Sequence, residues 1–187
     1  MASVITATTT SGLTQSADNS GVLQLASGTG NLVTVPSVTG TAMVSGNMPA
    51  FSAYANTSAT FTSGTTSKVA VNTIIFDTAN CFNTTTNRFT PNVAGYYQIN
   101  GKNRISGTNV TGNATLFKNG SQLIIGSYVT SQSSIVFSIV STIAYLNGTT
   151  DYIELYGYGD ATSGSPSFSF VSVGNCCEFS ASLVRAA

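Results

Sequence analysis

The sequence predicts an all-β protein, and three observations support that prediction. Only 6% of the 187 residues are charged, so Ser, Thr, Asn, Gln and Gly must supply the polar surface, and most of these suit strands and turns better than helices. From residue 49 onwards, short runs of β-branched and aromatic residues recur with turn-forming residues between them, as in a β-sandwich. No segment of useful length shows the helical spacing of apolar residues.

Strands are expected in the order of these runs: Ala50–Tyr54, Val69–Phe76, Arg88–Phe89, Gly95–Arg104, Asn113–Lys118, Ser121–Tyr128, Ser134–Tyr145, Asp151–Tyr158, Ser167–Val173 and Cys177–Val184. The Ile, Val, Phe and Thr content of Ser134–Tyr145 favours a buried strand. Asn119-Gly120 predicts a type I′ hairpin turn, because both residues tolerate positive φ, and Asn147-Gly148 repeats that chemistry.

Residues 1–48 differ from the rest and are predicted to form a separate segment ahead of a domain at 49–187. Two short β-prone runs flank Ser27-Gly28-Thr29-Gly30 and predict a β-hairpin. A lone hairpin is marginal in water, so it should dock on another chain or on copies of itself; a disordered tail is the alternative. Its apolar residues are the candidate anchoring contacts: Leu23, Leu25, Leu32, Val33 and Val35.

Charge and hydropathy exclude several classes of partner. Six cations balance six anions, and no basic cluster exists, which argues against nucleic-acid binding. No apolar run reaches the length of a spanning helix, so no membrane insertion is expected. The first residues lack a secretory signal, which predicts folding in a cytoplasm. Zero net charge favours a protein that works within an assembly.

Catalytic and metal-binding constellations are missing from the sequence. Without histidine there is no His-based triad or His metal site, and no cofactor is expected. Asp151 and Glu154 should point to opposite faces of a surface strand, so they do not form a glycosidase pair. Asp160, in a loop with Tyr158, is expected to close a turn, although the two residues form a candidate ligand-facing loop. The prediction is that the protein is not an enzyme.

The three cysteines form a poor disulfide framework. Cys176 and Cys177 are adjacent, so on a strand one should enter the core while the other faces outward or meets a subunit. A bridge from Cys81 to either of them remains an alternative.

One sequence block resembles a block of the complement-component-1q globular head, a family that shares the tumour-necrosis-factor-like jelly roll. The block is Phe89-Thr90-Pro91-Asn92-Val93-Ala94-Gly95-Tyr96-Tyr97. Pro49–Ala53, Thr115–Gly120 and Cys177–Val184 resemble other parts of that domain in the same order. The resemblance implies a jelly-roll β-sandwich that forms homotrimers through apolar and aromatic side chains. Trimer or core packing is expected of Phe51, Phe76, Phe89, Gly95, Tyr96, Tyr97 and Phe179, with Tyr96 and Tyr97 on opposite faces.

Residues 5–25 resemble the start of structural proteins of tailed bacteriophages. The combination implies a virion surface protein, assembled in the host cytoplasm, whose partners are itself and other virion proteins. The shortness of the chain favours a trimeric capsid decoration (cement) protein anchored through residues 1–48, with a host-adhesion role also open. The alternative is a short tail fibre or receptor-binding tip that recognises a host-surface glycan or protein. A wall-degrading enzyme is disfavoured because acid–base residues are missing.

Overall fold

The computed structural model describes residues 23–26, 32–35, 48–131, 134–171 and 176–187, the first two of these ranges by their backbone alone. The chain divides into two compact units, residues 1–41 and residues 42–187, and each is described by itself. All the described secondary structure is β, which confirms the predicted fold class. The described part contains no helix able to cross a bilayer.

In the first unit, β1 (Leu23–Ala26) and β2 (Leu32–Val35) pair antiparallel. Leu23 lies opposite Val35 and Leu25 opposite Val33, as expected for the two strands of a hairpin. The predicted hairpin is therefore present.

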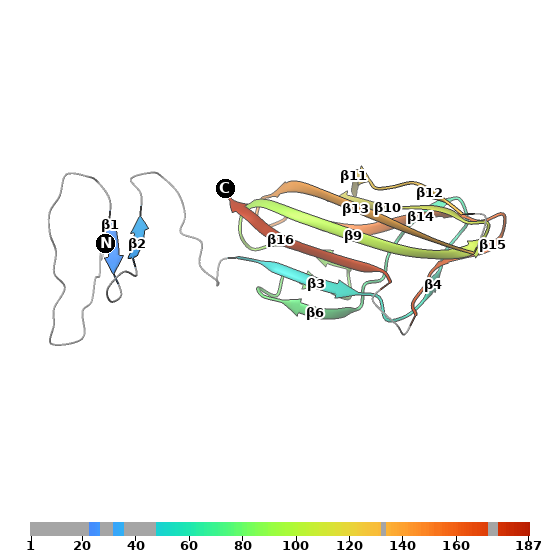
Figure 1. Ribbon diagram of the computed structural model, residues 1–187, viewed down its shortest axis with the longest axis horizontal. Helices are drawn as coiled ribbons and strands as arrows, with labels where there is room; N and C mark the ends of the chain where they lie inside the picture. The colour runs from blue at the N-terminus through green and yellow to red at the C-terminus, as the bar shows by residue number, and fades with distance from the viewer. Residues whose placement is uncertain (1–22, 27–31, 36–47, 132–133, 172–175) are drawn as a thin grey trace. The chain divides into compact units, whose positions relative to one another are not determined.

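The second unit is a sandwich of two seven-stranded sheets, and Figure 1 shows the first of them in front of the second. Sheet I contains β3 (Ala50–Tyr54), β4 (Ala59–Thr60), β6 (Thr73–Asp77), β9 (Gly95–Thr108), β13 (Ile135–Leu146), β15 (Ser163–Phe168) and β16 (Glu178–Ala186). Sheet II contains β5 (Thr65–Lys68), β7 (Phe82–Asn83), β8 (Arg88–Phe89), β10 (Thr111–Lys118), β11 (Ser121–Ile125), β12 (Val129–Thr130) and β14 (Ile153–Asp160).

The long strand β9 organises sheet I. One edge of β9 pairs with β13 along almost its whole length, from Gly95↔Leu146 to Ser106↔Ile135. Its other edge pairs with β16 and, further along, with β15. Since β16 pairs with β3 and β3 with β6, the order across the sheet is β13-β9-β16-β3-β6. The strands β13 and β6 therefore lie on opposite edges.

The core lies between the two sheets and is rich in aromatic rings. Phe51 on β3 stacks on Phe82 and on Phe89, with ring centroids 4.6 and 4.7 Å apart, and meets the edge of Phe179. Tyr97 is fully buried beside Phe89, and its hydroxyl donates a hydrogen bond to the Val93 carbonyl at 2.7 Å. Burial raises the pKa of Tyr97, so it remains a neutral donor. Aromatic pairs of this kind add to the apolar burial that holds a sandwich together.

One of the two predicted hairpin turns has the predicted backbone. Asn119 and Gly120 both have positive φ (52° and 76°), as a type I′ turn requires, and they join β10 to β11. The second prediction is wrong, since Gly148 has positive φ but Asn147 does not. Instead, the Asn147 side-chain oxygen accepts hydrogen bonds from the amides of residues 149, 150 and 151. The side chain thus closes this loop in place of a two-residue turn.

Several predicted strand limits were wrong. In Val69–Phe76 the strand is confined to Thr73–Asp77, while Val69 and Val71 are buried outside any strand. The sequence also missed the short strands β4, β5, β7 and β12, which have little apolar alternation of their own. Ser134–Tyr145 does form β13, but the prediction of full burial fails on one of its two faces.

Candidate functional site

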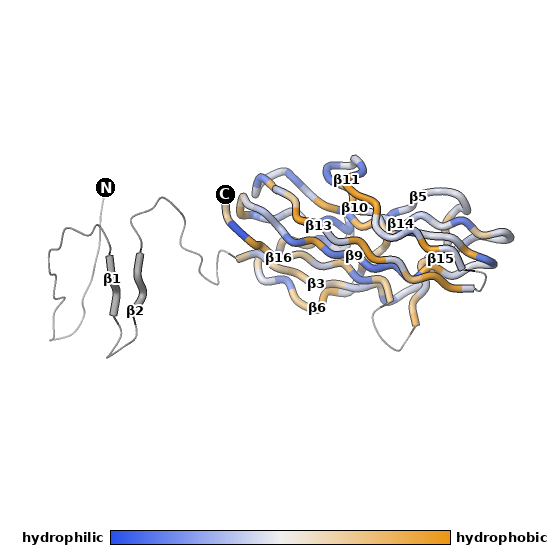
Figure 2. Tube along the Cα trace, turned by 45° about the horizontal axis from the view of Figure 1, so that its top comes forward, coloured by the Kyte–Doolittle hydropathy of each residue, from blue (hydrophilic) through white to orange (hydrophobic). Residues whose placement is uncertain are grey.

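Strand β13 exposes a row of large apolar side chains on the outward face of sheet I. Phe137, Ile139 and Ile143 are 55%, 63% and 56% exposed, and Tyr145 continues the same row. Their neighbours Val136, Val140 and Leu146 point into the core and are buried. The strand is therefore apolar on both faces, and Figure 2 shows the hydrophobic stretches along it. A strand of this composition is typical of one that is covered on both sides.

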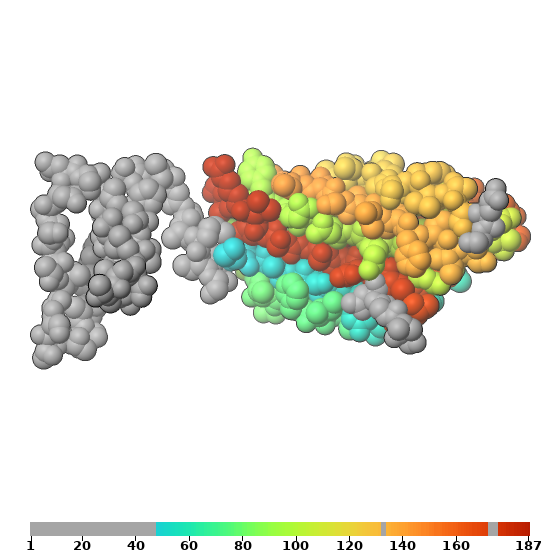
Figure 3. Space-filling view, in the orientation of Figure 1, coloured from blue at the N-terminus to red at the C-terminus, as the bar shows by residue number. Residues whose placement is uncertain are grey.

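A second apolar patch lies on the opposite edge of the same sheet. Ile74, Ile75 and Phe76 on β6 are between 43% and 51% exposed. In Figure 3 the strands β13, β9, β16, β3 and β6 run side by side across this face, from orange through yellow-green, red and cyan to green. Sheet I thus presents two different apolar patches, one at each edge.

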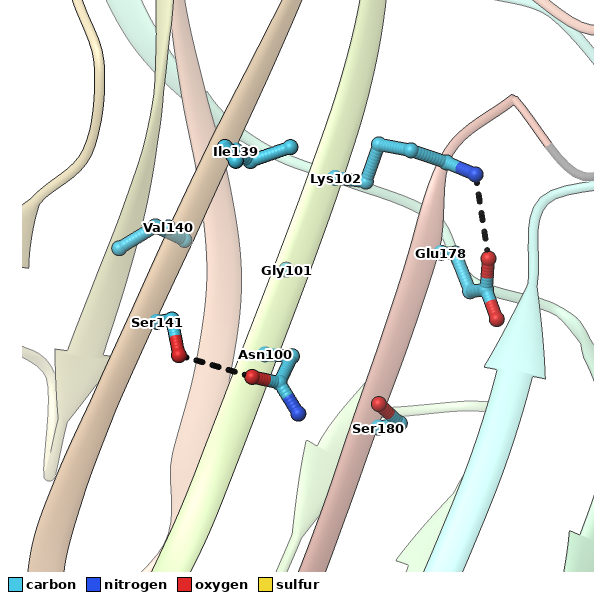
Figure 4. Close-up of a pocket in the computed structure, with 8 residues that line it drawn as sticks. All are labelled: Asn100, Gly101, Lys102, Ile139, Val140, Ser141, Glu178 and Ser180. Atoms are coloured by element: carbon cyan, nitrogen blue, oxygen red, sulfur yellow. Dashed lines mark hydrogen bonds and ion pairs between the residues drawn. The ribbon is translucent and has the colours of Figure 1, made fainter.

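The middle of this face is polar and holds an open pocket of about 280 Å³ (Figure 4). Asn100 accepts hydrogen bonds from Ser141 and Gln98, which ties β9 to β13. Lys102 and Glu178 form an ion pair of 3.2 Å between β9 and β16. The residues that line the pocket are Asn100, Gly101, Lys102, Ile139, Val140, Ser141, Glu178 and Ser180. The pocket contains one cation and one anion already paired and no acid–base pair suited to hydrolysis.

The structure places the predicted core and trimer residues in two groups. Phe51, Phe89, Tyr97 and Phe179 are buried in the sandwich core, and Gly95 is buried at the start of β9. Phe76 lies in the exposed patch of β6. Tyr96 points away from the core and meets the edge of Tyr145, with ring centroids 5.6 Å apart. The adjacent tyrosines Tyr96 and Tyr97 therefore face opposite sides of sheet I.

Gly95 lies where β9 approaches β16 most closely. A Cβ atom at this position would lie 2.4 Å from the Arg185 carbonyl oxygen and 2.7 Å from the Leu183 side chain. Because the nearer atom belongs to the backbone, no side-chain rotation could relieve the clash. This is the close approach for which the sequence selects glycine.

The expectation that Tyr158 and Asp160 form a loop is wrong, because both lie on the outward face of β14, at the end of the strand. The Tyr158 ring stacks on the exposed Tyr128, and burial raises the pKa of the Tyr158 hydroxyl. Asp160 accepts a hydrogen bond from the Ser63 hydroxyl at 2.9 Å. The pair is therefore together on the surface, with Asp160 held by a neighbouring loop.

The expectation that Glu154 occupies a solvent-facing position is wrong. The Glu154 side chain is 1% exposed. Its Oε1 atom forms ion pairs with Lys68 Nζ at 2.5 Å and with Arg88 Nε at 2.9 Å. Sequence alternation places Glu154 on the outer face of β14, but side chains from β5 and β8 cover it there. Asp151 lies before β14 and pairs with Lys118, and hydrogen bonds from Asn119 and Lys118 lower its pKa.

The cysteine prediction was also partly wrong, because Cys176 and Cys177 are both buried. Cys81 is buried too, and none of the three cysteines forms a disulfide in this structure. Burial raises the pKa of the Cys81 and Cys177 thiols. Among the described residues there is no cluster of three or more His, Cys, Asp or Glu side chains that could hold a metal.

The candidate anchoring residues belong to the first unit. Leu23 and Leu25 lie on β1, and Leu32, Val33 and Val35 lie on β2. Their side chains fall outside the described part of the chain.

Sequence reasoning missed the exposed row of β13, that is Phe137, Ile139, Ile143 and Tyr145. The signal was present: the run Ile-Val-Phe-Ser-Ile-Val-Ser-Thr-Ile-Ala-Tyr-Leu is apolar at both even and odd positions. A monomeric sandwich can cover only one of these two sets. The sequence analysis predicted a buried strand, and the structure buries only one of the two faces of β13.

Comparison with solved structures gives the fold. The globular domain of zebrafish complement 1qA is similar with a TM-score of 0.56 and 16% identity, covering 74% of this chain and 99% of that domain. The fold is a complement-1q-like jelly roll. The Eiger tumour necrosis factor from S. frugiperda gives a TM-score of 0.54 at 10% identity, covering 75% of this chain and 93% of its own. Murine APRIL gives 0.50 at 8% identity, covering 73% and 99%.

No family model and no curated protein matches the sequence. The fold predicted from the resemblance is confirmed, and identities this low establish the fold alone.

Proposed function

We propose that this protein is a non-enzymatic, homotrimeric structural protein of a virion surface, a capsid decoration protein in which residues 1–48 attach to other virion proteins and the jelly roll projects. One observation carries the self-association: the apolar row of β13 on an edge of sheet I is exposed in the monomer. Exposed apolar patches of this kind on a soluble domain mark an interaction surface.

The arrangement of the two patches favours a ring. The β13 row and the β6 patch are different surfaces on opposite edges of sheet I. Contact between unlike surfaces is heterologous and closes into a cyclic oligomer when the rotation permits. The number three follows from the resemblance to complement-1q and tumour-necrosis-factor jelly rolls. The scarcity of charge supports the same proposal, because few charged side chains have to be buried when the subunits meet.

Light scattering on the purified chain tests the oligomer. We expect a mass of about three times 19.2 kDa for the native protein and of 19.2 kDa for Ile139→Asp and Ile143→Asp. Thr66→Asp is the matched control, because Thr66 is exposed on β5 of sheet II, and its trimer should persist. A native monomer at micromolar concentration, or trimers in both β13 variants, would contradict the proposal.

The virion assignment rests on the resemblance of residues 5–25 to phage structural proteins and needs its own test. Deletion of residues 1–48 should leave a folded trimer that no longer attaches to particles. Attachment of the truncated protein would show that residues 1–48 are not the segment that attaches to the virion.

The second candidate is a short tail fibre or receptor-binding tip. The exposed Tyr128 ring, stacked on the half-buried Tyr158 near Asp160, favours it, because surface aromatic rings suit recognition. The copy number per particle separates the two: hundreds of copies indicate the capsid, and a few tens or fewer indicate the tail.

A further inference from the structure

The outward face of sheet II carries a row of aromatic side chains along β14. Ile153 and Leu155 are buried in the core, so the alternate residues Tyr152, Tyr156 and Tyr158 point outward. From Tyr152 to Tyr158 the row extends about 20 Å along the strand. Two further rings widen it, which are Phe117, stacked on Tyr156 with centroids 4.1 Å apart, and Tyr128, stacked on Tyr158. These five rings are called the aromatic strip below.

Two cations lie beside one end of the aromatic strip. The Arg88 guanidinium lies over the Tyr152 ring, 4.0 Å from its centroid, and Lys68 Nζ lies 5.8 Å from the centroid of Tyr156. Both cations bind the same oxygen atom of the buried Glu154. One carboxylate therefore neutralises two cations only in part, which leaves a formal charge of +1 at this place.

The two cations retain donors for a ligand. Arg88 bonds Glu154 through Nε, and its two terminal nitrogens have no hydrogen-bond partner in the described part of the chain. Lys68 donates to Glu154 and to the Thr86 carbonyl, which leaves its third proton. Both side chains remain about one third exposed. A guanidinium edge of this kind binds a carboxylate through two parallel hydrogen bonds.

The other charges near the strip do not cancel this one. Asp151 is paired with Lys118, so that pair is neutral. Asp160 lies at the far end, six residues along β14 from Glu154, about 20 Å away. The strip is therefore positive near Tyr152 and Tyr156 and negative beyond Tyr158.

We infer that the aromatic strip binds an acidic polysaccharide. The flat C–H faces of the sugar rings pack on the tyrosines, and a carboxylate of the chain binds Arg88 and Lys68. Charge complementarity selects the acidic sugar, and the length of the strip fits several consecutive sugar units. This surface belongs to sheet II, so self-association through sheet I leaves it open, and the inference goes beyond the proposed function.

Calorimetric titration of the full chain tests the inference with two probes, oligogalacturonate as the acidic chain and maltoheptaose as a neutral chain. We expect binding of oligogalacturonate that weakens with added sodium chloride, and much weaker binding of maltoheptaose. Arg88→Gln should weaken oligogalacturonate binding about tenfold or more, because a charge-assisted hydrogen bond is lost. Arg185→Gln on β16 removes the same charge from sheet I and should have no effect.

A thermal unfolding curve shows whether Arg88→Gln folds. If it does not, Tyr156→Ala and Lys68→Gln repeat the test. Absence of oligogalacturonate binding, equal binding of maltoheptaose, or equal losses in Arg88→Gln and Arg185→Gln would each overturn the inference. The mass measured by light scattering on the same samples reports self-association independently, so a failure of one idea is distinguishable from a failure of the other.

Discussion

Phe89→Ala offers a direct test of the packing on which the sandwich depends. Phe89 is fully buried, stacks on Phe51 and meets the edge of Tyr97 with centroids 5.5 Å apart. Truncation of a buried Phe to Ala costs about 3–5 kcal/mol. Because two ring pairs are lost together with the burial, we expect the upper half of that range, about 4–5 kcal/mol.

The free energy of unfolding is best measured by urea denaturation at one fixed protein concentration, since association makes stability depend on concentration. A loss of about 4 kcal/mol moves the midpoint by about 2 M urea for a slope of about 2 kcal/mol per M. Tyr128→Ala is the matched control: this ring is 62% exposed and belongs to neither apolar patch of sheet I, so its truncation should change stability by about 1 kcal/mol or less. A loss below about 1 kcal/mol in Phe89→Ala would show that the Phe89 ring is not packed in the sandwich core.

Three further substitutions probe other features. Gly95→Val should destabilise the domain by about 3 kcal/mol or more in the same urea assay, because its Cβ overlaps the Arg185 carbonyl; unchanged stability would remove the reason for this glycine. Glu154→Gln should cost about 2 kcal/mol, since Lys68 and Arg88 lose the charge that they share but remain partly in water; a neutral result would mean that the buried carboxylate is not needed for folding. The pKa of Asp151 lies below its ordinary value of 3.8, so the stability that Asp151 contributes is present above pH 3.8 and is lost as the pH falls through the lower folded-state pKa. Asp151→Asn should therefore weaken the fall in the free energy of unfolding at acid pH, and an unchanged pH dependence would contradict the assignment.

Much of the fold could be predicted from the sequence, because strand alternation and turn chemistry are local. Ile153 and Leu155 alternate with polar or aromatic neighbours, and both enter the core. Asn119-Gly120 forms its turn because the backbone conformation depends on these two residues themselves. Asn147-Gly148 has the same letters but a different loop, because the Asn147 side chain bonds three amides further along the chain. The same two letters therefore specify the type I′ turn only where no such side-chain competitor acts.

The sites were less accessible to sequence reasoning because they depend on contacts between distant segments. Glu154 is buried by Lys68 and Arg88, which lie 86 and 66 positions away in the chain. Nothing in the local pattern of β14 distinguishes a carboxylate in water from one under two cations. The exposed row of β13 poses the converse problem, since composition predicts a cover but does not identify it.

The outward faces of the two sheets differ in chemistry, and each of the two proposed interactions uses a different face. Sheet I exposes aliphatic and aromatic side chains at both edges with a self-compensated polar centre, in which Lys102 is already paired with Glu178. Such a face gains from contact with a second protein surface. Sheet II exposes tyrosines and a partly uncompensated cation pair, Lys68 with Arg88. A ring closed through sheet I would present several copies of this second face at once, and a long polymer that touches more than one copy would bind far more tightly than a short fragment. Weak affinity of a single aromatic strip for an oligosaccharide is therefore compatible with firm attachment of the assembled head to a polysaccharide surface.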